Sequence, residues 1–198
     1  MSRQLPLRYY PRGGKRRRAG RPPAGAKAGV SHALRDRFFR LLPVHVTMRM
    51  ARHVYNLRSR RSFSVIGDAI AKAAERFGVR IVEFAIEGNH IHLVVEAESH
   101  EALSQAMQGF SIRVAKGLNA MMGKRGRVLA DRYHSHALRT PTEARRAVAY
   151  VRNNHRRHMT QLGQTFGARY VDPFTAQGAA FEMPRPHTWL LRVHGPPN

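Results

Sequence analysis

Between residues 43 and 139 the hydrophobic side chains of the chain follow two different rhythms. One is the alternation of apolar and polar residues, or a run of strand-forming residues, that is typical of a strand with one buried face. It predicts four strands, over residues 44–50, 79–86, 90–96 and 127–139. The second and third of these are joined at Glu87-Gly88-Asn89, as in a hairpin.

Three other segments repeat their apolar residues at helical spacing. The first covers residues 66–77 and is expected to end at Gly78, because glycine commonly caps helix C-termini. The second is expected to run between the caps Ser99 and Gly123. The third begins at Thr140-Pro141-Thr142-Glu143, which is a capping box with proline at the first helical position.

The resulting order is strand, helix, strand, strand, helix, strand, which is the ferredoxin-like βαββαβ pattern. We therefore expect an α+β fold with an antiparallel sheet, and an added C-terminal helix after Thr140. Both crossover helices should cover one face of the sheet, with the first and third strands adjacent at its centre. The other, open face would then carry the polar side chains of these strands, which are His45, Thr47, Arg49, His90 and His92.

The net charge of the chain indicates which class of partner it binds. There are 35 Lys and Arg against 12 Asp and Glu, a net charge of +23, and such a field attracts nucleic acid. An architectural or ribosomal protein would have the same composition. Nine of the basic residues and no acid fall in residues 1–27, so residues 1–42 are predicted to form a largely disordered arm. Within the arm, DNA contacts are expected from Lys15, Arg16, Arg17 and Arg18.

Composition also excludes some classes of protein. The chain has no cysteine, which excludes disulfides and thiolate zinc sites. No apolar segment is long enough to span a bilayer, and the N-terminus lacks the apolar stretch of a secretory signal. We therefore expect a cytoplasmic, nucleoid-associated protein with no membrane partner.

Two histidines stand one residue apart inside the third predicted strand, in His90-Ile91-His92. Successive strand side chains point to opposite faces, so His90 and His92 share one face. Two imidazoles on a sheet suit a divalent metal better than a core, although the motif by itself is common. His90 and His92 are therefore candidate metal ligands.

The helix after Thr140 carries a tyrosine among arginines. Tyr150 and Asn154 lie one turn apart on the same face of this helix. Val148 and Val151 lie away from that face and can pack the helix against the rest of the domain. At this net charge, DNA contacts are expected from Arg146, Arg152 and Arg157 of the helix and from Arg49 of the first strand.

As a set, three motifs resemble those of the HUH superfamily of single-strand DNA nucleases, and specifically the REP-associated single-tyrosine transposases. They are His90-Ile91-His92, Tyr150-x-x-x-Asn154 and Arg132-Tyr133-His134-Ser135-His136. The resemblance covers residues 44–158, so a transposase domain is predicted over 43–159, followed by an irregular extension over 160–198. One departure is His155, where many REP-associated relatives have proline.

The resemblance implies a metal-dependent endonuclease and strand transferase acting on single-stranded or hairpin DNA. His90, His92 and Asn154 would hold Mg²⁺ or Mn²⁺, which polarises the scissile phosphate. Tyr150 would attack it, forming a 5′-phosphotyrosine and a free 3′-hydroxyl, with Arg146, Arg152 or the metal favouring the phenolate. Relatives act as monomers or homodimers, so the oligomeric state stays open.

Other interpretations of the same residues stay open as well. His134 and His136 form a second pair that could hold the metal, although their strand is expected at the sheet edge. Tyr133 is the alternative nucleophile, and His45 could contact phosphate from the neighbouring strand. A different class of function is a non-catalytic protein that binds DNA or RNA hairpins. The predicted open face carries no Phe or Tyr on its two central strands, which counts against an RNA reader that stacks bases there.

Overall fold

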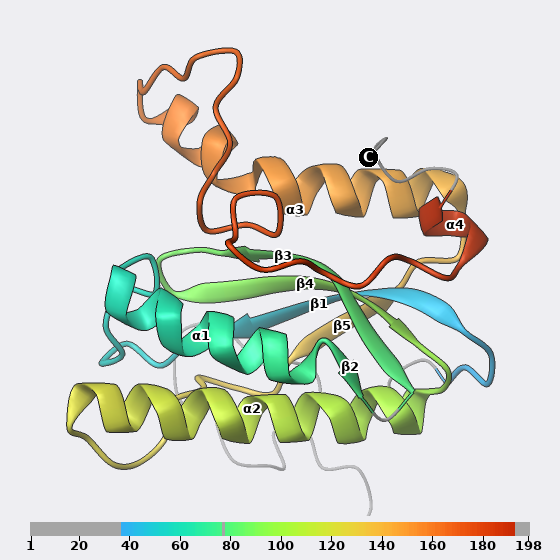
Figure 1. Cartoon of the computed structure of the whole chain (residues 1–198), viewed down its shortest axis with the longest axis horizontal. Coiled ribbons are helices and arrows are strands. Elements are labelled where there is room, and N and C mark those ends of the chain that lie inside the picture. Colours follow the sequence, from blue (N-terminus) through green and yellow to red (C-terminus); the bar gives the residue numbers. More distant parts are fainter. Residues whose placement is uncertain (1–36, 77, 193–198) are drawn as a thin grey trace, which may run out of the picture. The chain divides into compact units, whose positions relative to one another are not determined.

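The fold was analysed in a computed structural model that describes residues 37–76 and 78–192 (Figure 1). All of these belong to the unit formed by residues 32–198. The predicted basic arm lies outside the described residues up to position 36, including Lys15 and Arg16–Arg18. Phe38 and Leu42, at the end of the segment predicted as the arm, are buried in the core.

A five-stranded antiparallel sheet forms the centre of the fold. Its strands are β1 (Leu42–Arg49), β2 (Glu75–Arg76), β3 (Val79–Ile86), β4 (His90–Ala97) and β5 (His134–Ala137). They lie in the order β2-β3-β4-β1-β5, with β1 and β4 adjacent as the sequence predicts. The register pairs Thr47 with His92 and Arg49 with His90, so the polar residues of the two central strands meet on one face.

The helices are α1 (Arg60–Ala73), α2 (His100–Met122), α3 (Pro141–Gln161) and the short α4 (Trp189–Arg192). Three of the predicted helix caps are present. Ser99 accepts a hydrogen bond from the Ala102 N–H, Gly123 adopts a left-handed conformation with φ of 64°, and Thr140 forms its capping box with Glu143. None of the described helices is both long and apolar enough to cross a membrane.

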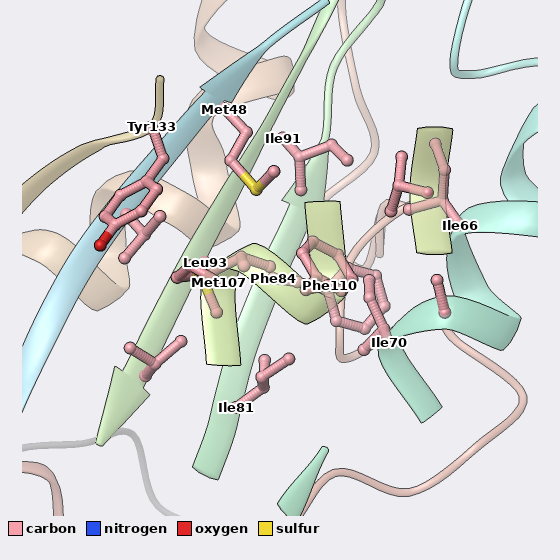
Figure 2. Close-up of a cluster of buried hydrophobic side chains, with 14 of the residues drawn as sticks. Met48, Ile66, Ile70, Ile81, Phe84, Ile91, Leu93, Met107, Phe110 and Tyr133 are labelled. Atoms are coloured by element: carbon pink, nitrogen blue, oxygen red, sulfur yellow. The ribbon is translucent and has the colours of Figure 1, made fainter. Parts of the chain in front are cut away.

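Helices α1 and α2 pack on one face of the sheet (Figure 1), as the strand–helix order predicts. The alternating residues of β1 and β4 turn toward these helices and join the main core. Figure 2 shows part of it, where Phe84, Leu93 and Phe110 are fully or almost fully buried together with Ile66 and Ile70. The described chain thus has the predicted α+β fold with an antiparallel sheet, and its strand order is compatible with the ferredoxin-like arrangement.

The opposite face of the sheet is not open, which corrects the sequence-based expectation. Helix α3 packs across β3 and β4 on that side (Figure 1). It does so because a second apolar cluster lies there, in which Val148 and Val151 of α3 meet Val82 and Val94 of the sheet. Around β1, β5 and the start of β4 this face keeps polar side chains, among them His45, His90 and His92.

Two element boundaries predicted from the sequence are wrong. Helix α1 ends at Ala73, because Glu75 and Arg76 pair with β3 as the short strand β2. Gly78, with φ of 69°, serves the turn between β2 and β3 and is not a helix cap.

The strand predicted over 127–139 is interrupted. Its first part bridges the end of β1 at Met50 and Leu129, and pairing resumes only at His134 as β5. The register with β1 changes between these two pairings, and in this interval the Tyr133 side chain lies in the main core (Figure 2).

The segment after α3 is tied to the sheet by polar contacts. Residues 174–176 run along the edge of β3, with the Ile86 N–H bonded to the Phe174 carbonyl at 2.9 Å and the Ala176 N–H to the Phe84 carbonyl at 3.0 Å. Asp172 forms a bidentate ion pair with Arg58. Further on, the buried carboxylate of Glu96 accepts hydrogen bonds from the backbone N–H groups of His187 and Thr188. These contacts hold the C-terminal residues against the edge and the α3 side of the sheet.

Candidate active site

A cluster of imidazole and phenol rings lies where β1, β4 and α3 meet. His45 of β1 stacks on His92 of β4, with ring centroids 5.3 Å apart. His90 stands at a right angle to His92, 4.7 Å away. The ring of Tyr150 on α3 meets His92 edge-on at 5.2 Å and His45 at 5.9 Å. The predicted histidine pair and the predicted tyrosine are therefore neighbours in the folded chain.

The neighbours of His92 contact one of its two ring nitrogens and leave the other without a partner among the described residues. Its Nδ1 lies 3.1 Å from the Thr47 hydroxyl and 3.2 Å from Nε2 of His45. A proton on Nδ1 satisfies these contacts and leaves the lone pair on Nε2. That Nε2 atom is buried and has no hydrogen-bond partner among the described residues. A buried acceptor of this kind destabilises the fold unless something binds it.

His90 is oriented in the same manner by its neighbour. Its Nδ1 lies 2.8 Å from the side-chain oxygen of Asn89, which can accept a proton from it. The lone pair then lies on Nε2, as it does for a metal-binding histidine held by a polar neighbour.

The histidines of this cluster are held neutral. Burial, with the nearby rings of His90, His45 and His158, lowers the pKa of His92 to about 3. Burial, with His134 and His136, lowers the pKa of His45 to about 4. Burial also lowers the pKa of His90, against the opposing charge of Glu87. Neutral imidazole is the form that binds a metal ion, so these rings need no deprotonation near neutral pH.

Helix α3 presents its reactive side chain to the cluster while its other side is buried. Val148 and Val151 anchor the helix in the apolar cluster on the sheet. Tyr150, between them in sequence, turns toward the histidines and is 40% exposed, so its ring is accessible beside them. Arg146, one turn earlier, is exposed on the same side of the helix.

Asn154 follows Tyr150 by one helical turn and is almost fully buried. Its amide nitrogen donates a hydrogen bond of 3.2 Å to Oε1 of Glu87, in the hairpin that leads into His90. This bond turns the amide so that Oδ1 is left without a hydrogen-bond partner among the described residues, and that oxygen too is buried. Glu87 also approaches His155, with 3.4 Å between Oε2 and Nδ1.

These donor atoms fit a divalent metal with mixed nitrogen and oxygen ligands. Two of the predicted ligands, His92 and Asn154, each keep a buried lone pair that nothing in the described chain uses. No three His, Cys, Asp or Glu side chains of the described residues are arranged to hold a metal. A metal site here would therefore need a ligand of another type, and the Asn154 amide oxygen is the candidate.

The structure separates the alternative candidates from this cluster. The Tyr133 ring lies in the main core on the other face of the sheet (Figure 2). His134 and His136 of the edge strand β5 are exposed and stand opposite Thr47 and His45. They share the face of the cluster but lie one strand farther from His90.

The predicted DNA-contacting arginines fall into two groups. Arg49 and Arg157 are exposed, as is Arg146. Arg152 is not: it pairs with Glu83 of β3 on the other flank of α3, away from Tyr150.

Sequence reasoning missed two groups of this site. Glu87 was expected only as a turn residue, and its contact with Asn154 depends on how α3 lies on the sheet. His158 lowers the pKa of both His90 and His92 and hence lies near them. Its signal was present in the sequence, because His158 continues the i, i+4 stripe of Tyr150 and Asn154.

Comparison with known proteins places this fold in a class. A solved structure described as a REP-associated tyrosine transposase bound to a REP hairpin has the same fold, with a TM-score of 0.52 and 17% sequence identity, covering 65% of this chain and 74% of that one. A Deinococcus radiodurans R1 protein proposed to be a transposase is similar with a TM-score of 0.43 and 12% identity, covering 63% of this chain and 92% of that one. Among curated proteins, none matches this sequence.

The fold is thus that of a single-tyrosine transposase. Residues 40–154 match the family model of IS200-like transposases, and the chain belongs to that family. The matched segment contains His90, His92, Tyr150 and Asn154.

Proposed function

We propose that this protein is a metal-dependent endonuclease and strand transferase that acts on single-stranded or hairpin DNA through Tyr150. The observation that supports the proposal most is the edge-on contact of the Tyr150 ring with His92, whose buried Nε2 has no hydrogen-bond partner among the described residues. The hairpin bound by the structurally similar REP-associated transposase supports hairpin DNA as the substrate.

His90, His92 and Asn154 would hold Mg²⁺ or Mn²⁺. When bound, such an ion supplies positive charge that stabilises the developing charge on a phosphate. The chain's own residues supply the remaining chemistry. Thr47 and Asn89 hold the two imidazoles in the required tautomer, and Glu87 holds the amide of Asn154.

In the cleavage step the Tyr150 phenol gives up its proton and its oxygen bonds to the phosphorus. The bond from phosphorus to O3′ of the preceding nucleotide breaks, and that oxygen takes up a proton and departs as a 3′-hydroxyl. The product is a 5′-phosphotyrosine. One ester bond of the phosphorus is exchanged for another, so the number of phosphodiester bonds does not change. A 3′-hydroxyl from another strand end can reverse the step, so rejoining needs no ATP.

The test uses end-labelled hairpin DNA with single-stranded extensions, taken from the sequence that flanks the gene, with Mn²⁺ or Mg²⁺. We expect a protein–DNA adduct that survives denaturation, requires the metal, persists in Tyr133→Phe and disappears in Tyr150→Phe and His90→Ala. Loss of the adduct only in Tyr133→Phe would contradict the proposed nucleophile. Tight DNA binding without any adduct would favour the non-catalytic hairpin-binding protein.

A further inference from the structure

A second polar site lies on the other flank of α3. Consecutive helical residues are about 100° apart, so Arg152 points almost opposite to Tyr150 across the helix. There, a cavity of about 470 Å³ opens between β3, α3, α4 and the C-terminal segment. Nothing in the proposed chemistry of Tyr150 uses it.

A β-bulge creates the polar wall of this cavity. The pairing of β3 with β4 passes from Ile81 opposite Val95 to Glu83 opposite Val94, which leaves Val82 as an extra residue. Val82 and Glu83 both line the cavity, so the side chains of two consecutive residues lie on the same face of the sheet. Bulges commonly redirect a side chain next to a functional site.

The carboxylate of Glu83 is only half satisfied. Its Oε1 accepts hydrogen bonds from Arg152, with 3.0 Å to Nε and a second bond from Nη2. Its Oε2 is buried and has no hydrogen-bond partner among the described residues, while the whole residue is 7% exposed. A buried carboxylate oxygen without a donor is unfavourable in the unliganded protein, and it is ready to accept from a ligand.

The chemistry of the other lining residues indicates which kind of ligand would fit the cavity. Val82, Val148, Pro184 and Pro186 give apolar walls, and Arg185 and Arg192 join Arg152 around the single acid. Apolar walls suit a flat ring, and the arginines suit a phosphate chain that leads to it. The cavity volume lies in the range of small-ligand sites.

We propose that this cavity, the α3–β3 pocket, receives an unpaired guanine of the DNA substrate, a few nucleotides from the phosphate beside Tyr150. The proposal rests on the proposed function for the identity of the substrate. Guanine presents two adjacent donors, N1–H and the N2 amino group, to Glu83 Oε2, and its O6 acceptor can meet the remaining donors of Arg152. Adenine lacks the two adjacent donors. Thymine would turn carbonyl oxygens toward the carboxylate, and cytosine offers a single amino group.

The test measures binding without cleavage, by fluorescence anisotropy of labelled oligonucleotides with the full chain in EDTA. The probes are a 12-nucleotide oligothymidylate and the same strand with one central guanine, adenine or cytosine. We expect the guanine strand to bind about tenfold more tightly than oligothymidylate, in line with the discrimination of a bidentate base contact. Equal affinities, a preference for adenine or cytosine, or tighter binding of the matching guanine-bearing RNA would overturn the proposal.

The variant Glu83→Gln keeps the shape of the side chain but places an amide where Oε2 or Oε1 stood. We expect it to lose the guanine preference while its affinity for oligothymidylate changes less than twofold. The matched control is Glu182→Gln, an exposed carboxylate on the C-terminal segment that does not line the pocket, and it should keep the preference. A guanine preference that persists in Glu83→Gln would overturn the proposal.

A measurement on the unaltered protein covers the case in which Glu83→Gln does not fold. An oligothymidylate with one 6-thioguanine keeps the N1 and N2 donors and crosslinks to adjacent side chains on irradiation. The crosslinked peptide should contain pocket residues such as Gln177, Met183 or Arg192. A crosslink confined to other parts of the chain would overturn the proposal.

The two proposals can fail separately. A Tyr150 adduct without a guanine preference would support the proposed function and overturn the pocket assignment. A guanine preference that depends on Glu83, without any adduct, would support the pocket and overturn the proposed chemistry.

Discussion

The two faces of the sheet are built by different physical means. The face under α1 and α2 is covered by apolar side chains that fill the main core (Figure 2). The face under α3 has a smaller apolar cluster, with the histidine cluster on one side of it and the Glu83–Arg152 pair on the other. One face is arranged for stability, because apolar burial is the main favourable term in folding. The other keeps polar groups at some cost in stability.

On the α3 side three side-chain acceptors are left without a hydrogen-bond partner among the described residues, and Oδ1 of Asn119 on α2 is a further atom of this kind. Nε2 of His92, Oδ1 of Asn154 and Oε2 of Glu83 are all buried on the α3 side. Each is an acceptor, and each lies beside a group that fixes its direction. Buried acceptors held in place are poor contributors to folding and good ligands for a metal ion or a base. Changes on the two faces should therefore separate stability from activity.

The largest expected effect is the loss of chemistry when the histidine cluster is broken. In His92→Ala the proposed metal site would lose a ligand, so the adduct with hairpin DNA should fall below detection at any Mn²⁺ concentration. In the unaltered protein, EDTA should abolish the adduct and added Mn²⁺ should restore it. The matched change His134→Ala, in the exposed pair of β5, should leave the adduct in place, and its loss there instead would move the metal site to β5.

A change on the α1–α2 face should act on stability alone. Phe110→Ala removes a nearly fully buried ring from the main core, and such changes cost about 3–5 kcal/mol in the free energy of unfolding. Urea unfolding followed by circular dichroism measures it. The control Ile112→Ala, on the same helix but half exposed, should cost about 0.5 kcal/mol or less. An adduct yield per folded molecule that drops in Phe110→Ala would contradict the separation of the two faces.

The smallest expected effect concerns the residue that orients His92. Thr47→Val keeps the shape of the side chain and removes the hydroxyl that lies 3.1 Å from Nδ1. Loss of such a partner typically weakens metal binding about 10- to 100-fold, which a Mn²⁺ titration followed by electron paramagnetic resonance can measure. Thr142→Val, at an exposed position of α3, is the matched control. Unchanged Mn²⁺ affinity in Thr47→Val would mean that the Thr47 hydroxyl does not orient His92 for metal binding.

Local patterns in the sequence determined most of the fold. The alternation in β1 and β4, the caps at Ser99, Gly123 and Thr140, and the succession of strands and helices along the chain all follow from backbone geometry that acts over a few residues. They also sufficed to place His90 with His92, and Tyr150 with Asn154, because each pair shares one face of one element. The predicted first strand begins too late, because Leu42 and Pro43 already pair with β4 before the alternation starts at Val44.

Only the tertiary structure decided how these pairs combine. Helix α3 could have left the second face of the sheet open, and its packing on Val82 and Val94 is a contact between distant segments. The same packing brings Glu87 to Asn154. Simple alternation from Val79 would turn Glu83 toward the main core, and the bulge at Val82 turns it to the other face instead. A bulge arises from the pairing of two strands, so the period of a single strand cannot reveal it.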